Sequence, residues 1–372
     1  MNVINSSGSF KIFGDSVKTY NRLPVGTYSV VFNPNEGYSL VQKSDMIITE
    51  EKIYGNNQKK VDKAMKSYIH SSKNFGVLLS GDKGIGKTLF LKMLATSAIK
   101  EGIPVIVVSN SYPNIADFIS SIEQDAIVVF DEFEKIFRVG VQIGNGPSPQ
   151  DELLPLLDGT DCGHKMFVVT CNAVSQISYF MLNRPGRFHY HFELKPPTHE
   201  EITEYLRDKL NPEYHDNIEK IANLASVMNM PYDHLRAIVF EMNQGYSLSE
   251  TMEDVNIGYD AESAFDIEVK TTDGRMWHAY GCRICLYKTE LERCRVINFG
   301  KDGTDSLFVF FNPSEIKFKD NVLTVDGRVV LSHDPYYDEG DDDDDDENKK
   351  EFKFESIVFK KVISYSKHNY DV

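Results

Sequence analysis

The residues with the clearest chemical potential are the eight of Gly81–Thr88, which read Gly-Asp-Lys-Gly-Ile-Gly-Lys-Thr. An apolar run (76–80) precedes them and a helix-like stretch (88–98) follows, which is the strand, loop and helix context of a phosphate-binding P-loop. Glycines allow backbone N–H groups to point inward at a helix N-terminus and to form an anion cradle. The expected phosphate ligands are Gly81, Lys83, Gly84, Ile85, Gly86, Lys87 and Thr88, with Lys87 neutralising phosphate oxygens and the Thr88 hydroxyl ligating Mg²⁺.

Two adjacent carboxylates, Asp131 and Glu132, follow the apolar run 126–130. A buried parallel strand would place them at the carboxyl edge of its sheet, where open α/β sheets bind ligands. We expect Asp131 to hold Mg²⁺, directly or through water, and Glu132 to act as the general base on an attacking water. An Asp-Glu pair after a strand is also a common helix start, but beside a P-loop the catalytic interpretation is favoured.

The elements that must position these residues are indicated by hydrophobic patterns. Apolar runs alternate with helix-like stretches between about 52 and 195, which predicts a parallel α/β sheet covered on both faces. Thr198 and Glu201 have capping-box spacing at the start of a helical stretch. Strand-like alternation occurs on both sides of these regions. We therefore predict a β-rich N-terminal domain over 1–50, an α/β nucleotide-binding subdomain over 51–197, a small helical lid over 198–257, and a β-rich C-terminal domain over 258–372 with an acidic loop at 338–347.

Ordered motifs between residues 53 and 242 resemble those of AAA ATPases of the AAA+ superfamily. Gly81–Thr88 and Asp131-Glu132 correspond to the two Walker motifs, and Leu153–Gly159 is similar to the leucine-pair and Asp-Gly segment. Phe167–Asn172 resembles the sensor strand, and Asn183–Phe188 matches the Arg-Pro-Gly-Arg-Phe element. The resemblance implies a P-loop AAA+ core with ATP and Mg²⁺ as cofactors.

The resemblance also implies roles for individual residues. Asn172 takes the sensor 1 position, Arg184 that of the arginine finger, and Arg187 that of its neighbour, both arginines reaching the γ-phosphate of an adjacent subunit. Fixed, always protonated cations suit this task. Tyr54 and Gly55 resemble the adenine-side segment. A finger acting in trans implies a homo-oligomeric ring, usually a hexamer.

The chain departs from the family pattern in two places. The usual sensor 2 position falls on Asp233, with Arg236 as a candidate one turn further on. Members that thread polypeptide place an aromatic, an apolar residue and a glycine after the second strand, but the segment 107–114 offers only Tyr112. The glycine-rich loop 139–149 is either pore-lining or a connector. Threading therefore does not follow from the sequence.

Two further clusters carry metal-ligand chemistry. His278, Cys282, Cys285 and Cys294 together form a possible zinc set, but Cys282 and Cys285 would face opposite ways on one strand, so buried thiols are the favoured interpretation. His189 and His191 share a strand face but lack a visible third ligand.

Composition limits the remaining classes of function. The 372 residues are 41% hydrophobic and 26% charged, as in an ordinary globular protein. The net charge of −16 argues against nucleic acid as the default partner, although local basic surfaces remain possible. The acidic run Asp341–Glu347 is expected to be a solvated loop or a surface for a basic partner. There is no apolar run of membrane-spanning length, and residues 1–20 lack a basic start followed by an apolar run, so we expect neither a membrane span nor a signal peptide. The five cysteines favour a reducing cytoplasm.

These observations, with the resemblance, imply a Mg²⁺-dependent ATPase ring that remodels, unfolds or disassembles a protein client or complex. Two alternatives stay open. One is a nucleic-acid motor or clamp-loader relative, and the other is a nucleotide-gated scaffold with little turnover. The client is not named by the sequence.

Overall fold

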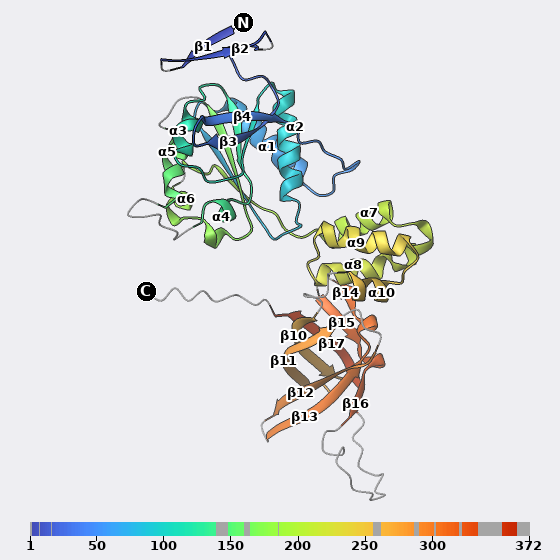
Figure 1. The fold of residues 1–372 in the computed structure, drawn as a ribbon. Helices are drawn as coiled ribbons and strands as arrows, with labels where there is room; N and C mark the ends of the chain where they lie inside the picture. Colours follow the sequence, from blue (N-terminus) through green and yellow to red (C-terminus); the bar gives the residue numbers. More distant parts are fainter. Residues whose placement is uncertain are drawn as a thin grey trace, which may run out of the picture. The chain divides into compact units, whose positions relative to one another are not determined.

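The computed structural model describes residues 2–6, 8–15, 17–138, 148–159, 164–184, 186–255, 262–285, 290–300, 303–319, 322–333 and 352–362. The chain divides into two compact units, Met1–Lys195 and Pro196–Val372. Figure 1 shows the elements of both units. The acidic loop expected at 338–347 and most of the loop 139–149 lie outside the described residues.

The first unit contains a seven-stranded sheet in the order β4-β3-β6-β7-β8-β5-β9, in which only the β3–β4 pair is antiparallel. The strands are β3 (Thr27–Asn33), β4 (Gly37–Lys43), β5 (Phe75–Ser80), β6 (Val105–Val108), β7 (Ala126–Phe130), β8 (Lys165–Cys171) and β9 (Tyr190–Glu193). Every residue of β5, β7 and β8 is buried. Such continuous burial is typical of a parallel sheet covered on both faces, and it confirms the predicted α/β core.

Helices pack on the two faces of this sheet and separate its core into two clusters. Val77 and Leu79 of β5 face α1 (Asn57–His70) and α2 (Lys87–Lys100). Leu78, with the opposite orientation, faces the side of the sheet that carries α3 (Ile115–Ser120), α4 (Phe133–Ile136), α5 (Leu154–Asp158) and α6 (Tyr179–Leu182). The alternation follows from the two-residue period of a strand. Because the side chains of β5 pack on both faces of the sheet, the strand is held firmly, and so is the start of the loop that follows it.

We expected a separate domain over 1–50, but in the structure the second half of this segment belongs to the seven-stranded sheet. β3 pairs in parallel with β6, from Thr27 opposite Val105 to Ser29 opposite Val107, so the β3–β4 hairpin extends the nucleotide-binding sheet. Tyr28 and Val30 are 4% and 3% exposed, and their burial against the core is the physical reason for this pairing. Within the described part of residues 1–50, β1 (Asn2–Ser6) and β2 (Ser9–Phe13) form a separate two-stranded sheet.

The second unit contains helices followed by an antiparallel sheet. The helices are α7 (His199–Lys209), α8 (Ile218–Val227), α9 (Tyr232–Asn243) and α10 (Leu248–Asp254). Thr198 and Glu201 form the expected capping box at the start of α7. The eight-stranded sheet has the order β14-β15-β17-β10-β11-β12-β13-β16, which confirms a β-rich C-terminal region. Its strands are β10 (Glu262–Thr271), β11 (Met276–Cys285), β12 (Glu292–Gly300), β13 (Gly303–Phe311), β14 (Lys317–Lys319), β15 (Val322–Asp326), β16 (Leu331–His333) and β17 (Phe354–Lys361).

Among the described residues, no helix has both the length and the apolar character needed to cross a bilayer.

Candidate functional site

The predicted P-loop lies between β5 and the N-terminus of α2, which begins at Lys87. Gly84 and Gly86 have φ values of 75° and 99°, in the region that favours glycine. A Cβ on Gly81 would come within 2.6 Å of the Leu194 carbonyl oxygen, so this position also requires glycine. Ile85 is 5% exposed and packs into the core, so its contribution to a ligand is through its backbone. The exposed Lys83 lies on the same loop.

The Lys87 ammonium connects this loop to the end of β8. Its Nζ donates to the carbonyl oxygens of Gly81 and Asp82, the latter at 2.8 Å, and to Asn172 Oδ1 at 2.8 Å. Burial lowers the pKa of Lys87, and nearby carboxylates, Glu134 foremost, act in the opposite direction. These three acceptors use all three N–H donors of the ammonium, so a phosphate bound by the loop would replace one or more of them.

Asn172 is oriented by a carboxylate that the sequence analysis missed. Glu134 Oε1 accepts from the Asn172 backbone N–H at 2.9 Å and from its Nδ2 at 2.6 Å. Glu134 is only 8% exposed, and its second oxygen, Oε2, is buried without a hydrogen-bond partner among the described residues. The available signal was a carboxylate three residues after Asp131, on the first turn of the short helix α4. The sequence interpretation assigned roles to Asp131 and Glu132 and none to Glu134.

Asp131 and Glu132 lie at the end of β7 beside Thr170 of β8. The Thr170 hydroxyl donates to Asp131 Oδ1 at 2.6 Å and accepts from the Glu132 backbone N–H at 2.8 Å. Glu132 has φ 51° and ψ 48°, a left-handed conformation at the start of α4. Its carboxylate is half-exposed and forms an ion pair with Lys135. The Glu132 carboxylate therefore remains accessible to solvent while its backbone is fixed.

The donor set near the loop suits Mg²⁺, which prefers oxygen ligands and retains several waters. Asp131 supplies a carboxylate. Thr88 is exposed, and its hydroxyl makes no hydrogen bond to a described residue. These two residues would hold the ion together with phosphate oxygens.

The two arginines expected to act in trans have different surroundings. Asp158, the last residue of α5, accepts from Arg184 Nη1 at 2.7 Å and from Arg187 Nε and Nη2 at 2.8 and 3.0 Å. The Arg184 side chain is 65% exposed and that of Arg187 only 8%. Arg187 also donates to the Phe180 carbonyl oxygen. Hydrogen bonding from Arg187 lowers the pKa of the Asp158 carboxyl. Arg187 is thus held within its own chain, and Arg184 is accessible.

The remaining candidates are less closely connected to the loop. The half-buried Tyr54 has the Lys52 ammonium 5.0 Å from its ring centre, and Gly55 has φ 77°. Asp233 and Arg236, the sensor 2 candidates, are exposed and paired with each other at 3.9 Å.

The loop after β6 is held by the β3–β4 hairpin. The Tyr112 ring lies 5.7 Å from that of Phe32 and 6.2 Å from that of Tyr38. Tyr38 Oη donates to the Pro113 carbonyl oxygen at 2.6 Å. The one aromatic residue available for a pore is therefore packed against its own chain.

Neither of the two clusters with metal-ligand chemistry forms a metal site among the described residues. No group of three or more His, Cys, Asp or Glu side chains suited to a metal ion occurs among the described residues. Cys282 and Cys294 are free thiols whose sulfurs lie 2.9 Å apart. The Cys285 side chain lies outside the described atoms. His191 Nε2 lies 2.7 Å from Ser80 Oγ, and His189 packs on Phe75.

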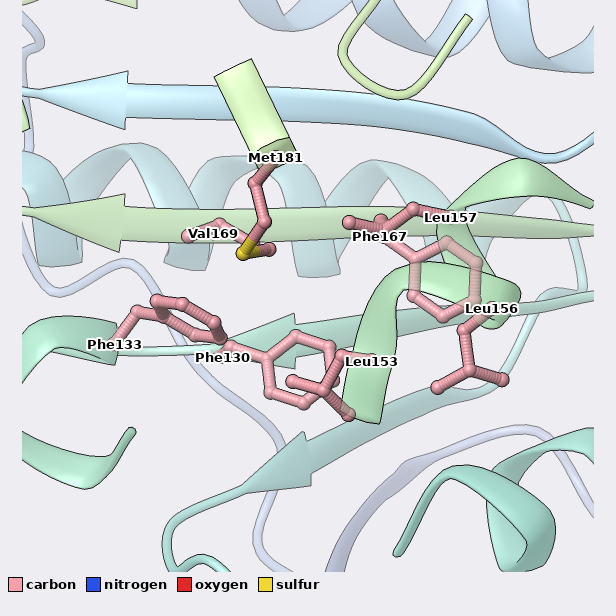
Figure 2. A pocket seen from close by; sticks show the side chains of 8 residues that line it. All are labelled: Phe130, Phe133, Leu153, Leu156, Leu157, Phe167, Val169 and Met181. Atoms are coloured by element: carbon pink, nitrogen blue, oxygen red, sulfur yellow. The ribbon is translucent and has the colours of Figure 1, made fainter. Parts of the chain in front are cut away.

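A small apolar cavity lies against β7 and β8, and Figure 2 shows the side chains that line it. They come from β7, β8, α4, α5, α6 and the 3-10 turn before α5: Phe130, Phe133, Leu153, Leu156, Leu157, Phe167, Val169 and Met181. All eight are hydrophobic, so this cavity belongs to the core and not to a nucleotide site.

The strand order, the glycine-rich loop at a helix N-terminus and the carboxylates at neighbouring strand ends define a P-loop nucleotide-binding domain. The family model described as "ATPase family associated with various cellular activities (AAA)" matches residues 77–196. The ATP-dependent zinc metalloprotease FtsH 1 of Symbiobacterium thermophilum is 31% identical over 144 residues, which cover 33% of this chain and 23% of that protein. Residues 77–196 are therefore an AAA-family ATPase domain of the AAA+ superfamily. The chain spans less than a quarter of the relative's length.

Proposed function

We propose that this protein binds ATP and Mg²⁺ at the P-loop and hydrolyses ATP to ADP and phosphate. The observation that carries the proposal is the hydrogen-bonded set that joins the loop to two strand ends: Lys87 bonds to Asn172, and Asn172 to Glu134, beside Asp131 and Thr170. Buried polar groups paired in this way are preorganised for a charged ligand.

The residues divide the chemistry among them. Lys87 neutralises phosphate oxygens, and Thr88 and Asp131 hold Mg²⁺, which spreads the phosphate charge when it is bound. Glu132 accepts the proton of the attacking water. Asn172, fixed by Glu134, orients the attacked phosphate group.

We further propose a homo-oligomeric ring, with six subunits as in related rings, in which Arg184 acts on the neighbour's nucleotide. Its exposure supports this role, because an arginine that acts in trans must be reachable. Buried Arg187 is better suited to positioning: it fixes Asp158, which in turn holds Arg184. This revises the expectation that both arginines reach the phosphate.

The work of the ring is proposed to be remodelling of a protein or complex. Tyr112 is packed against Phe32 and Tyr38, which argues against threading by this residue while the β3–β4 hairpin is in place. We therefore expect the client to be bound by other surfaces of the protein.

Replacement of Glu132 by Gln tests the proposal. It should preserve ATP binding and lower the steady-state rate by about 10²-fold or more, because the general base is lost. Mass measurement in solution should show a ring-sized species with ATP and Mg²⁺ and a smaller one without them. An unchanged hydrolysis rate would show that Glu132 is not the general base. A monomer at saturating ATP would show that the protein does not form a ring. If the wild-type protein binds ATP and assembles but has no measurable turnover, the scaffold alternative is correct.

A further inference from the structure

The sheet of the second unit curls around its own core. The rings of Phe311 on β13 and Phe359 on β17 lie 5.1 Å apart, although these strands are not neighbours in the sheet. Trp277, Val296 and Val309 of the middle strands are at most 1% exposed. Because successive side chains of a strand point to opposite faces, the residues between these positions on β12 and β13 face outward. On β11 the register shifts between Ala279 and Cys282, so that both Tyr280 and Arg283 face outward while Ala279 and Ile284 are buried.

The outward positions of β11, β12 and β13 carry an unusual set of side chains. We call it the aromatic–arginine face, and it consists of Tyr280, Arg283, Arg293, Arg295, Phe308 and Phe310. Tyr280 is 70% exposed, all three arginines are exposed, and both phenylalanines are partly exposed. Arg293 lies opposite Phe310, and Arg295 lies opposite Phe308. The Arg293 guanidinium also lies 4.7 Å from the centre of the Phe308 ring.

The charge of this face is opposite to that of the protein. Within the described parts of β11, β12 and β13, no outward position holds an acidic residue, although the chain carries a net charge of −16. None of the three arginines forms an ion pair with a described residue, and Arg295 donates only to the Ser306 hydroxyl. On the adjacent strand β10, the described outward acids are Glu268, which is paired with Lys360, and Asp266, which accepts from the Gly281 backbone N–H at 3.0 Å at the edge of the face.

Cations beside exposed rings suit a ligand with both anionic groups and flat apolar surfaces. Phe308 and Phe310 are two residues apart on one strand, about 6.6 Å, which leaves room for one base on each ring. Arginine is the preferred side chain for phosphate. At physiological salt, charge elsewhere on the protein is screened beyond about 8 Å, so the local charge of the face dominates at contact.

We propose that the aromatic–arginine face binds single-stranded nucleic acid, with bases stacked on Phe308 and Phe310 and phosphates held by the three arginines. This binding does not depend on ATP hydrolysis, so its test is separate from that of the proposed ATPase.

The test is fluorescence anisotropy of labelled oligo-dT and oligo-rU 20-mers with the full chain, in ADP so that the P-loop is occupied. The expected affinity at low salt is micromolar, and log K should fall with log salt with a slope near −2, about 0.7 for each of three phosphates. Arg293→Gln combined with Arg295→Gln should reduce that slope by more than half and weaken binding. Phe310→Leu keeps apolar bulk but removes the ring, and should weaken binding by about fivefold or more.

Arg328→Gln is the matched control, since Arg328 lies in the same unit, is 87% exposed and is already paired with Asp326. Circular dichroism confirms that each variant is folded. The proposal is overturned if no single strand binds at 50 mM salt, if Arg328→Gln weakens binding as much as the double variant, or if a poly-glutamate peptide binds more tightly than either oligonucleotide. The last result would assign the face to an acidic protein partner.

Discussion

At the scale of residues, the site depends on a few buried polar contacts whose partners are far apart in sequence. Glu134 and Asn172 are 38 residues apart, yet one oxygen of Glu134 accepts both the backbone and side-chain N–H groups of Asn172. A buried acceptor that satisfies two donors fixes their direction, because each unpaired group would cost about 1–3 kcal/mol. Asn172 is thereby aimed at Lys87.

Glu134→Ala should lower the ATPase rate by about 10²-fold, because a displacement of about 1 Å at the sensor has effects of that size. ATP affinity should change much less, since Lys87 and the loop remain. Glu134→Gln keeps an acceptor for Asn172 and should recover most of the rate. Single-turnover hydrolysis and nucleotide titration separate the two effects. Equal loss in both variants would show that the negative charge of Glu134 matters, and not its hydrogen bonds.

Asp158→Asn should destabilise the first unit by about 3 kcal/mol, because it leaves the buried Arg187 without its carboxylate. Since Arg187 lowers the pKa of Asp158 in the folded state, this stabilisation is complete above the ordinary carboxyl pKa of about 3.9 and is lost as pH falls through the folded value. The difference between wild type and variant in urea unfolding should therefore shrink toward acid pH.

Asp62→Asn is the control: Asp62 is exposed and, among the described residues, accepts from the Gln58 side chain, so the change should shift stability by about 0.5 kcal/mol or less. A pH-independent difference for Asp158→Asn would exclude the ionised pair as the cause.

At the scale of elements, the β3–β4 hairpin both extends the sheet and holds the loop after β6. Addition of a strand beside β6 covers an edge that would otherwise present unpaired backbone groups. The same hairpin supplies Phe32 and Tyr38, which pack on Tyr112. Burial raises the pKa of Tyr38 to about 12, so its hydroxyl remains a donor to Pro113 throughout the physiological range.

Two neighbouring valines on β3 test this arrangement. Val30 is 3% exposed and Val31 is 38% exposed, on opposite faces of the strand. Val30→Ala should lower the free energy of unfolding by about 2 kcal/mol through lost burial and a residual cavity. Val31→Ala should change it by about 0.5 kcal/mol or less. Equal effects in thermal unfolding would mean that β3 is not packed as part of the sheet.

At the scale of the whole molecule, the proposed ring requires that one chain complete the site of another. Arg184 is exposed, and its partner Asp158 lies in its own chain. In a ring each interface is head to tail, so the P-loop of one subunit would face Arg184 of the next. Assemblies that mix two different variants can therefore test whether Arg184 acts in trans.

Arg184→Ala and Lys87→Ala should each lower the ATPase rate by about 10³-fold. An equimolar mixture should regain activity, since about a quarter of the interfaces would pair an intact P-loop with an intact finger. The check is the steady-state rate against mixing ratio, with each variant's assembly measured by mass. No recovery in assembled mixtures would show that Arg184 acts within its own chain or not at all.

The sequence by itself determined the nucleotide-binding core, because its signals are local. Glycines at fixed spacing before Lys87 and an apolar run before Asp131 each specify conformation within a few residues, and the family model covers both. The capping box at Thr198 does the same for the start of α7, just beyond the matched residues. Only the tertiary structure decided that β3 joins β6, that Glu134 orients Asn172 and that Arg187 is buried against Asp158. These contacts join residues 29 to 78 positions apart. They are selected by packing and by the need to pair buried polar groups, which no local pattern encodes.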